Sequence, residues 1–179
     1  MTSKFLYFAY GSNLLAKRIH LSNPTAVMKD IGYIKNFRLD FQRYSTRWHG
    51  ASATIVETEN SVVWGVIWEL DKCNLSTLDC QEGVQDNIYH VLSVNVETPN
   101  GTILNCRVYQ QCTNPKEYIK LADLSMDKRP SPLYLDTILK GAQENNLPAD
   151  YIELLKTIPH NGYEGKYDIR YKQVVNIFC

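Results

Sequence analysis

The sequence has no surplus of charge of either sign. Nineteen Lys and Arg residues balance nineteen Asp and Glu residues among 179, and no run of Lys or Arg interrupts that balance. Binding to nucleic acid or to an anionic membrane surface needs a basic patch or stripe. The composition therefore argues against nucleic acid and membranes as partners, and it leaves small neutral or zwitterionic molecules open.

Patterns of disulfide-bonded and metal-binding residues are also missing. The five cysteines are odd in number and include no C-x-x-C pair, and the four histidines show no metal-ligand spacing. We therefore predict no disulfide framework and no zinc or other metal site. Cys73 and Cys80 lie seven residues apart on one face of a predicted helix, where we expect them to pack in the core.

Long hydrophobic runs are absent as well. The apolar run at residues 5–10 is too short for a membrane span or a signal peptide, and only Lys4 precedes it, so we expect a cytoplasmic protein. Hydrophobic residues make up 44% of the chain and charged residues 21%, which is an ordinary globular composition. This length suits one domain, residues 1–179, with a sizeable core.

Strand and helix patterns are intermixed without regular βαβ spacing and without a G-x-G-x-x-G motif, so the predicted fold class is α+β. Asn100-Gly101 lies between two alternating runs and predicts a hairpin, and Glu59-Asn60 predicts a turn between two separate strands. Residues 111–132 are expected to be irregular with one helical turn, and residues 158–179 show no clear pattern. The expected strands are 4–10, 26–44, 52–58, 61–70, 89–96 and 103–109, and the expected helices are 14–21, 71–83, 132–143 and 148–157.

A buried strand is followed directly by a helix in residues 5–19, FLYFAYGSNLLAKRI. Gly11, Ser12 and Asn13 occupy the junction, and two explanations fit them. Glycine permits a sharp bend, and Ser12 or Asn13 then caps the helix. Alternatively, the unpaired backbone N–H groups of the junction hold an anion or a developing oxyanion.

The second informative segment is LDCQEGV, residues 78–84. If Gly83 ends the preceding helix, Glu82 lies in its last turn, where the helix dipole disfavours a carboxylate by roughly 0.3–1 kcal/mol. Together with burial, that field would raise the pKa of Glu82 and make it a better base. Asp79 would lie on the same helix face and raise the pKa further. The alternative is an exposed glutamate at a frayed helix end.

The sequence offers no obvious nucleophile of its own. No G-x-S-x-G motif surrounds a serine, and no histidine is near Ser12 in the chain. The segment RPSPLY, residues 129–134, is either a rigid turn or a means of delivering Tyr134 to a site.

Taken together, these segments resemble the γ-glutamylcyclotransferases. The resemblance rests on YFAYGSNLL (7–15), WHG (48–50), VWGVIW (63–68), LDCQEGV (78–84), Tyr89, PSPLY (130–134) and ENNLP (144–148), in the order and at the spacings of that family. The pairing of the YGSN turn with LDxxEG is the specific part. The resemblance implies a mixed, barrel-like β-sheet flanked by helices, and a homodimer.

The resemblance also implies a cofactor-free cyclotransferase reaction. A γ-glutamyl amino acid cyclises to 5-oxoproline and releases the free amino acid, because the substrate's α-amine attacks its own γ-carbonyl. By position, Glu82 becomes the proton acceptor, and Tyr89 and Tyr134 close the pocket. The implied substrate cradle is Tyr7, Phe8, Ala9, Tyr10, Gly11, Ser12 and Asn13.

Three alternatives stay open at this point. Two of them are substrate preferences, that of the glutathione-specific branch and that of the branch acting on γ-glutamylamines; they stay open because the segment before Pro130 is longer than in close members of the family. A third alternative is a protein that binds a γ-glutamyl metabolite without turning it over.

Overall fold

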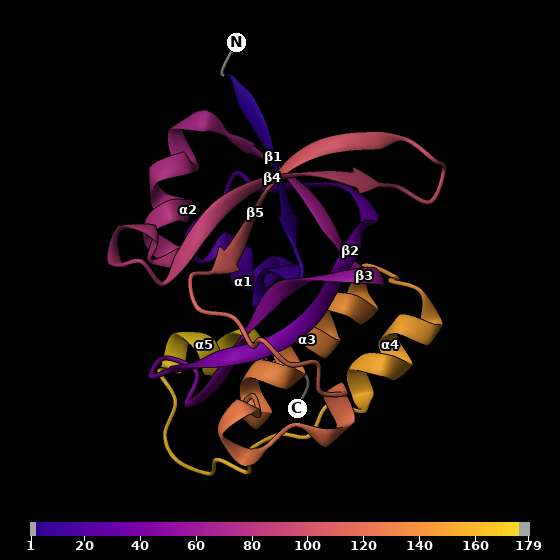
Figure 1. Ribbon diagram of the computed structural model, residues 1–179. Helices are drawn as coiled ribbons and strands as arrows, with labels where there is room; N and C mark the ends of the chain where they lie inside the picture. The colour runs from indigo at the N-terminus through magenta and orange to yellow at the C-terminus, as the bar shows by residue number, and fades with distance from the viewer. Residues whose placement is uncertain (1–2, 176–179) are drawn as a thin grey trace.

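The computed structural model describes residues 3–175, and its centre is a closed barrel of five strands (Figure 1). The strand order around the barrel is β1-β3-β2-β4-β5, with antiparallel neighbours except for the parallel contact between β1 and β5. This arrangement confirms the predicted α+β class with a mixed, barrel-like sheet. The strands are β1 (Lys4–Ala9), β2 (Val27–Ser45), β3 (Gly50–Asp71), β4 (Tyr89–Glu97) and β5 (Ile103–Gln111).

The two strands predicted at 52–58 and 61–70 are one strand, β3, so the turn expected at Glu59-Asn60 is wrong. Strand β2 pairs with β3 on both sides of that point, and the register shifts where Lys35 faces Val62 and Phe37 faces Glu57. Asn36 and Asn60 both have a positive φ there, and the Asn60 N–H donates to Asn36 Oδ1 at 3.2 Å. The asparagines therefore mark an irregularity inside a long hairpin.

Within the described residues, five α-helices flank the barrel (Figure 1). Short 3-10 turns precede two of them, at Ser12–Leu14 and Lys72–Asn74. Residues 121–123 and 126–128 form two further 3-10 turns where one helical turn was predicted, and the C-terminal region without a clear pattern contains α5. The helices are α1 (Ala16–His20), α2 (Leu75–Glu82), α3 (Pro132–Glu144), α4 (Ala149–Lys156) and α5 (Ile169–Val175).

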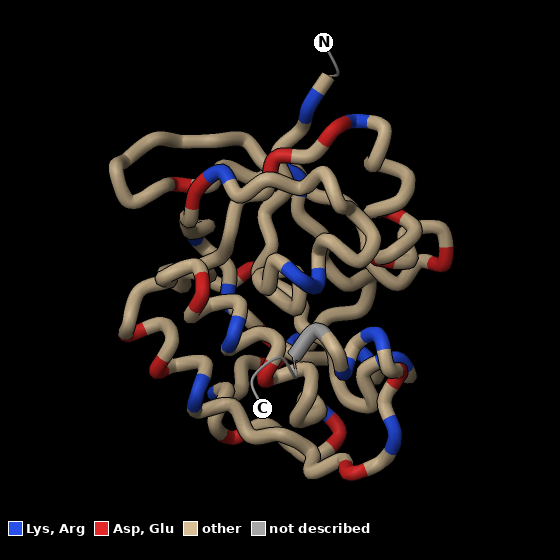
Figure 2. The backbone as a smooth tube through the Cα atoms, turned by 180° about the vertical axis from the view of Figure 1, so that it is seen from behind, with Lys and Arg blue, Asp and Glu red and all other residues tan. Residues whose placement is uncertain are grey.

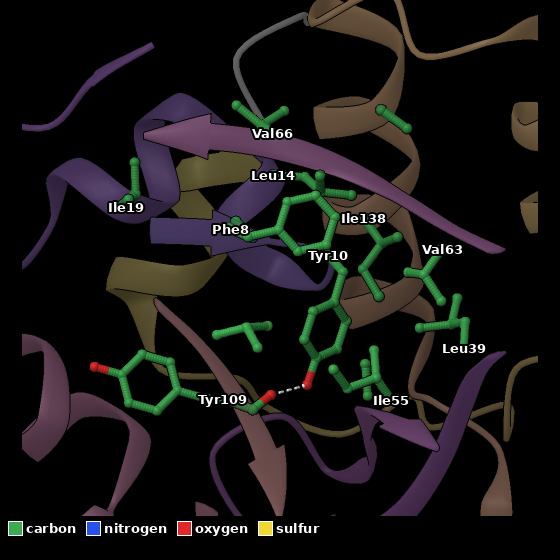
Figure 3. Packing of buried hydrophobic residues seen from close by; sticks show 14 of the residues in the cluster. Phe8, Tyr10, Leu14, Ile19, Leu39, Ile55, Val63, Val66, Tyr109 and Ile138 are labelled. Carbon is green, nitrogen blue, oxygen red and sulfur yellow. Dashed lines mark hydrogen bonds between the residues drawn. The ribbon is translucent and has the colours of Figure 1, made fainter. Parts of the chain in front are cut away.

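The core fills the barrel and the space between the barrel and α3. Phe8, Phe41, Ile55 and Ile138 are completely buried, and Figure 3 shows part of this packing. Apolar residues that alternate along the strands and recur at helical spacing along α3 supply these side chains, so the pattern in the sequence produces the core directly.

Helix α2 is the exception to that rule. Cys73 and Cys80 are exposed, so the prediction that they pack in the core is wrong. Only Leu78 is buried in this helix. A spacing of seven places two residues on one helix face, but it does not determine whether that face meets the core or the solvent.

Charged residues are spread over the molecule, and both signs occur on every side of the view in Figure 2. Within residues 3–175, no helix is long and apolar enough to cross a membrane.

Candidate active site

The junction between β1 and α1 forms one wall of a small polar chamber. The Leu14 N–H donates to the Gly11 carbonyl at 3.0 Å, which fixes the turn. Neither Ser12 nor Asn13 makes a side-chain cap, so the capping explanation for these residues is wrong. Among the described residues, the backbone N–H groups of Gly11, Ser12 and Asn13 have no hydrogen-bond partner.

Glu82 lies opposite this turn. It is the last residue of α2, and Gly83 follows in the left-handed conformation with φ +66°, as the sequence predicted. Asn13 Nδ2 donates to Glu82 Oε1 at 3.2 Å, and Gln81 Nε2 donates to the same oxygen at 3.4 Å. Glu82 is partly buried and held by the turn, which contradicts the alternative of an exposed, frayed helix end.

Burial raises the pKa of Glu82 above its usual 4.5, while Arg18 and Arg47 act in the opposite direction. Asp79 was expected to raise this pKa further, but its carboxylate pairs with Arg107 at 2.6 Å and accepts the Tyr109 hydroxyl at 2.5 Å. Its charge is therefore compensated on another side of the helix. Burial, and not a neighbouring acid, raises the pKa of Glu82 and makes its carboxylate a stronger base.

Asn13 connects the turn to the acid. Its side chain is 3% exposed, and Nδ2 donates to the Tyr7 hydroxyl at 3.1 Å as well as to Glu82. Gln81 Nε2 donates to Asn13 Oδ1 at 3.2 Å, and Trp68 Nε1 donates to the Asn13 carbonyl at 2.9 Å. These bonds bring together residues that lie 69 positions apart in the chain, and they fix the Glu82 carboxylate relative to the free backbone amides.

Tyrosine side chains form most of the remaining wall. The Tyr89 hydroxyl donates to the Ala53 carbonyl at 2.7 Å, and the Ala53 N–H donates to the Tyr134 hydroxyl at 3.1 Å. The Tyr10 hydroxyl donates to the Tyr109 carbonyl at 2.5 Å, as Figure 3 shows. Burial raises the pKa of Tyr89 to about 12 and that of Tyr134 still higher. Both tyrosines are therefore neutral hydrogen-bonding groups at physiological pH.

These groups enclose an inner chamber of about 40 Å³. It opens into an outer cavity of about 310 Å³, with which it shares Ser12, Glu82, Tyr89 and Tyr134. Phe8 and Ala9 line neither cavity, because both are packed in the barrel core, at 0% and 1% exposure. The inner chamber is lined by Tyr7, Tyr10, Gly11, Ser12, Asn13, Ala53, Glu82, Tyr89, Tyr109 and Tyr134.

Sequence reasoning missed three arginines that line the outer cavity, Arg18, Arg43 and Arg47. Arg43 and Arg47 are exposed, and nothing in the sequence separates them from other surface arginines. The position of Arg18 could have been noticed in the sequence, because Arg18 follows Leu14 by four residues and therefore falls on the apolar face of the predicted helix. A buried charge on such a face is a recognisable anomaly. Within the described residues, no three His, Cys, Asp or Glu side chains are grouped so that they could hold a metal ion.

The raised pKa of Glu82 leads us to expect that the stability of the folded protein depends on pH through this group. A carboxyl group whose pKa is raised by folding stabilises the folded state below its unfolded pKa, and this contribution is lost as the pH rises through the folded pKa. The Glu82→Gln variant does not titrate and keeps the acceptor for Asn13 and Gln81. We therefore expect its Tm to exceed that of the wild type by about 2–4 °C at pH 8, and the difference to vanish near pH 4.

Differential scanning calorimetry at pH 4, 6 and 8 measures this difference. Other titrating groups are common to both proteins and cancel in the comparison. A difference in Tm that stays constant over this pH range would contradict a raised pKa for Glu82.

Comparison with known proteins shows the class to which this barrel fold belongs. The sequence model of the AIG2-like family matches residues 62–155. A solved structure described as γ-glutamyl cyclotransferase superposes with a TM-score of 0.87 at 41% identity, covering 97% of this chain and 98% of that one. The mouse γ-glutamylcyclotransferase is 43% identical over 175 residues, which span 96% of this chain and 87% of the mouse protein.

The chain belongs to the γ-glutamylcyclotransferase family, which confirms the resemblance predicted from its motifs. The human γ-glutamylcyclotransferase is 42% identical over the same length. A yeast γ-glutamyl cyclotransferase specific to glutathione has the same fold, with a TM-score of 0.60, but only 13% identity.

Proposed function

We propose that this protein is a cyclotransferase that converts γ-glutamyl amino acids into 5-oxoproline and the free amino acid. The observation that carries the proposal is the position of Glu82, held by Asn13 across a small chamber from the unpaired amides of Gly11 to Asn13. An acid–base group and a set of oxyanion donors facing one enclosed volume are what acyl transfer requires. The names of the relatives support the same assignment.

In this reaction the nucleophile belongs to the substrate. Its α-amine forms a bond to its own γ-carbonyl carbon, and the bond from that carbon to the amino acid nitrogen breaks. The protein therefore needs no nucleophilic serine or cysteine and no cofactor. Its first task is to fold the flexible glutamyl chain into an attacking conformer, and the narrow inner chamber suits that task.

The turn performs the second task, which is to stabilise the negative charge of the reaction. As the amine attacks, negative charge develops on the γ-carbonyl oxygen. The amides of Gly11, Ser12 and Asn13 are unpaired among the described residues and border the chamber. We assign them to this oxyanion because backbone donors fixed before the reaction need no reorganisation during it.

Glu82 performs the third task, proton transfer. Its carboxylate takes a proton from the substrate ammonium, which frees the attacking electron pair, and then passes that proton to the departing nitrogen. Expelled without a proton, that nitrogen would be a very poor leaving group. As the bond to the departing nitrogen breaks, the ring nitrogen gives up its second proton to Glu82, which releases it to the free amine, so the products are 5-oxoproline with a neutral ring amide and an amino acid with an ammonium group. The raised pKa of Glu82 suits both steps, because a group with a pKa closer to neutrality both accepts and donates readily.

Tyr134 and Tyr89 complete the proposed pocket. The Tyr134 hydroxyl accepts from the Ala53 N–H, and within residues 3–175 its own proton has no acceptor. That proton is therefore available for the α-carboxylate of the glutamyl group. Tyr89 is held by Ala53 and Gln111 and shapes the adjacent wall. A homodimer, a cytoplasmic location and a single domain over residues 1–179 also belong to this proposal.

The test is release of 5-oxoproline measured by mass spectrometry. Purified protein is incubated with γ-glutamyl-alanine and, separately, with glutathione, with the Glu82→Gln variant as the control. We expect 5-oxoproline from the dipeptide and almost none with the variant. Release mainly from glutathione would keep the chemistry and assign the protein to the glutathione-specific branch. Binding of both compounds without 5-oxoproline would support a non-catalytic binding protein and contradict the proposal.

A further inference from the structure

Arg18 is the most unusual charged residue in the described chain. It lies on α1, and its side chain is only 2% exposed. No salt bridge involves it among the described residues, and Nε and Nη1 have no hydrogen-bond partner there. Removing a guanidinium from water without a partner costs several kcal/mol. Glu82 attracts Arg18 through space, but within the described residues the two form no salt bridge, so this buried arginine without a bonded partner calls for an additional anion.

Two aromatic rings lie against the guanidinium of Arg18, which also borders the outer cavity. Its Cζ lies 5.1 Å from the ring centre of Tyr171 and 5.8 Å from that of Trp48. Both aromatic rings stabilise the cation but offer no oxygen to its N–H groups. Arg18 also borders the outer cavity, together with Glu82 and Arg47. An anion that enters this cavity therefore meets a guanidinium that is already oriented.

The distribution of charge between the two chambers identifies the anion. No lysine or arginine lines the inner chamber among the described residues, whereas the outer cavity has three arginines against two acids, Glu82 and Asp86. A γ-glutamyl amino acid carries two carboxylates, one on the glutamyl group and one on the amino acid that leaves. In the proposed reaction the reacting end of the glutamyl group faces Glu82 and the inner chamber. The carboxylate of the leaving amino acid then extends into the outer, positively charged cavity.

We propose that Arg18 binds the carboxylate of the leaving amino acid and thereby selects γ-glutamyl amino acids over γ-glutamylamines. The planar guanidinium of Arg18 matches a carboxylate in a bidentate arrangement. Beyond Arg47, the outer cavity joins a hollow of about 780 Å³, so the side chain of the leaving amino acid meets few constraints. Specificity therefore depends on the carboxylate more than on the side chain. This inference rests on the proposed function and names the substrate class of the same site.

The test compares two substrates that differ only in this carboxylate, γ-glutamyl-alanine and γ-glutamyl-alaninamide. We expect the wild-type protein to favour the acid by about 10–100-fold in kcat/KM, the effect typical of hydrogen bonds to a charged group. Arg18→Met should abolish the preference, because it lowers activity on the acid more than activity on the amide. The change in charge next to Glu82 affects both substrates equally, so it cancels in the ratio.

Lys17→Gln is the matched control, because it removes a positive charge from the same helix at an exposed position. It should keep the wild-type ratio. Arg18→Lys keeps the charge without the planar fork and should give an intermediate ratio. If Arg18→Met does not fold, the wild-type ratio and Arg18→Lys still decide the question.

Two results would overturn the inference. One is a wild-type protein that turns over the acid and the amide equally well. The other is an Arg18→Met variant that slows both substrates by the same factor, which would assign Arg18 to the glutamyl group or to Glu82. If the wild type releases no 5-oxoproline at all, the proposed function fails separately. Calorimetric binding of the same two compounds then tests Arg18, and equal affinities would contradict its role.

Discussion

Replacing Glu82 by glutamine is expected to slow 5-oxoproline release by about 10²–10⁴-fold, the range typical of a lost general acid–base group. Glutamine has the same shape and retains an oxygen for the N–H groups of Asn13 and Gln81, which now bind Glu82 Oε1. It cannot accept the proton of the substrate ammonium or return it to the leaving nitrogen. The loss should therefore appear in kcat, with little change in KM.

Steady-state kinetics with γ-glutamyl-alanine measures this effect. Glu59→Gln serves as the control, since Glu59 is an exposed acid that lines neither cavity, and it should stay within about threefold of the wild type, as surface substitutions usually do. A Glu82→Gln variant with nearly normal kcat would exclude Glu82 as the group that transfers the proton. The pH profile gives a second readout, because activity should fall as the pH drops through the raised pKa of Glu82.

The second large effect is expected from Gly11→Val, which should lower kcat/KM by about 10²-fold or more. A Cβ at this position would lie 3.3 Å from the Tyr134 hydroxyl and 3.5 Å from Ala53 Cβ. The two further methyl groups of valine would occupy the inner chamber of about 40 Å³ or displace the turn. A displacement of about 1 Å in a reacting group can cost this much in rate.

The backbone of Gly11 corrects one part of the argument from sequence. Its φ is −111°, so glycine is not required here by a positive φ, and the expected damage from valine comes from steric crowding. Gly11→Ala should therefore be much milder than Gly11→Val, because the contacted hydroxyl ends a side chain that can shift. Ser12→Ala should also be mild, since its amide and not its side chain is the proposed donor. A Gly11→Val variant with normal turnover would show that this turn does not border the reacting atoms.

Much of the fold was predictable because it follows from local patterns. The strand at residues 4–10, the turn at Gly11 and the helix that ends at Gly83 depend on side-chain periodicity and on the conformations allowed to glycine. The Asn100-Gly101 hairpin depends on turn geometry in the same way. The order and spacing of these short segments were enough to identify the family.

Other features depended on distant parts of the chain. Strand β3 continues through Glu59 and Asn60 because β2 pairs with it on both sides. Cys73, in the 3-10 turn before α2, and Cys80, on α2, are exposed, whereas Leu78 is the residue of α2 that packs in the core. In each case the local pattern was compatible with two structures, and pairing or packing with another element selected one of them.

In the candidate site, too, some features follow from local sequence and others depend on distant parts of the chain. The sequence by itself determined that an acid precedes Gly83 and that a strand-to-helix turn follows Tyr10. Only the tertiary structure decided that Asn13 binds Glu82, that Asp79 instead pairs with Arg107, and that Arg18 is buried beside the cavity. The physical reason is that chain periodicity governs local conformation, whereas the pKa of an acid and the partners of a charge depend on burial by residues far away in the sequence.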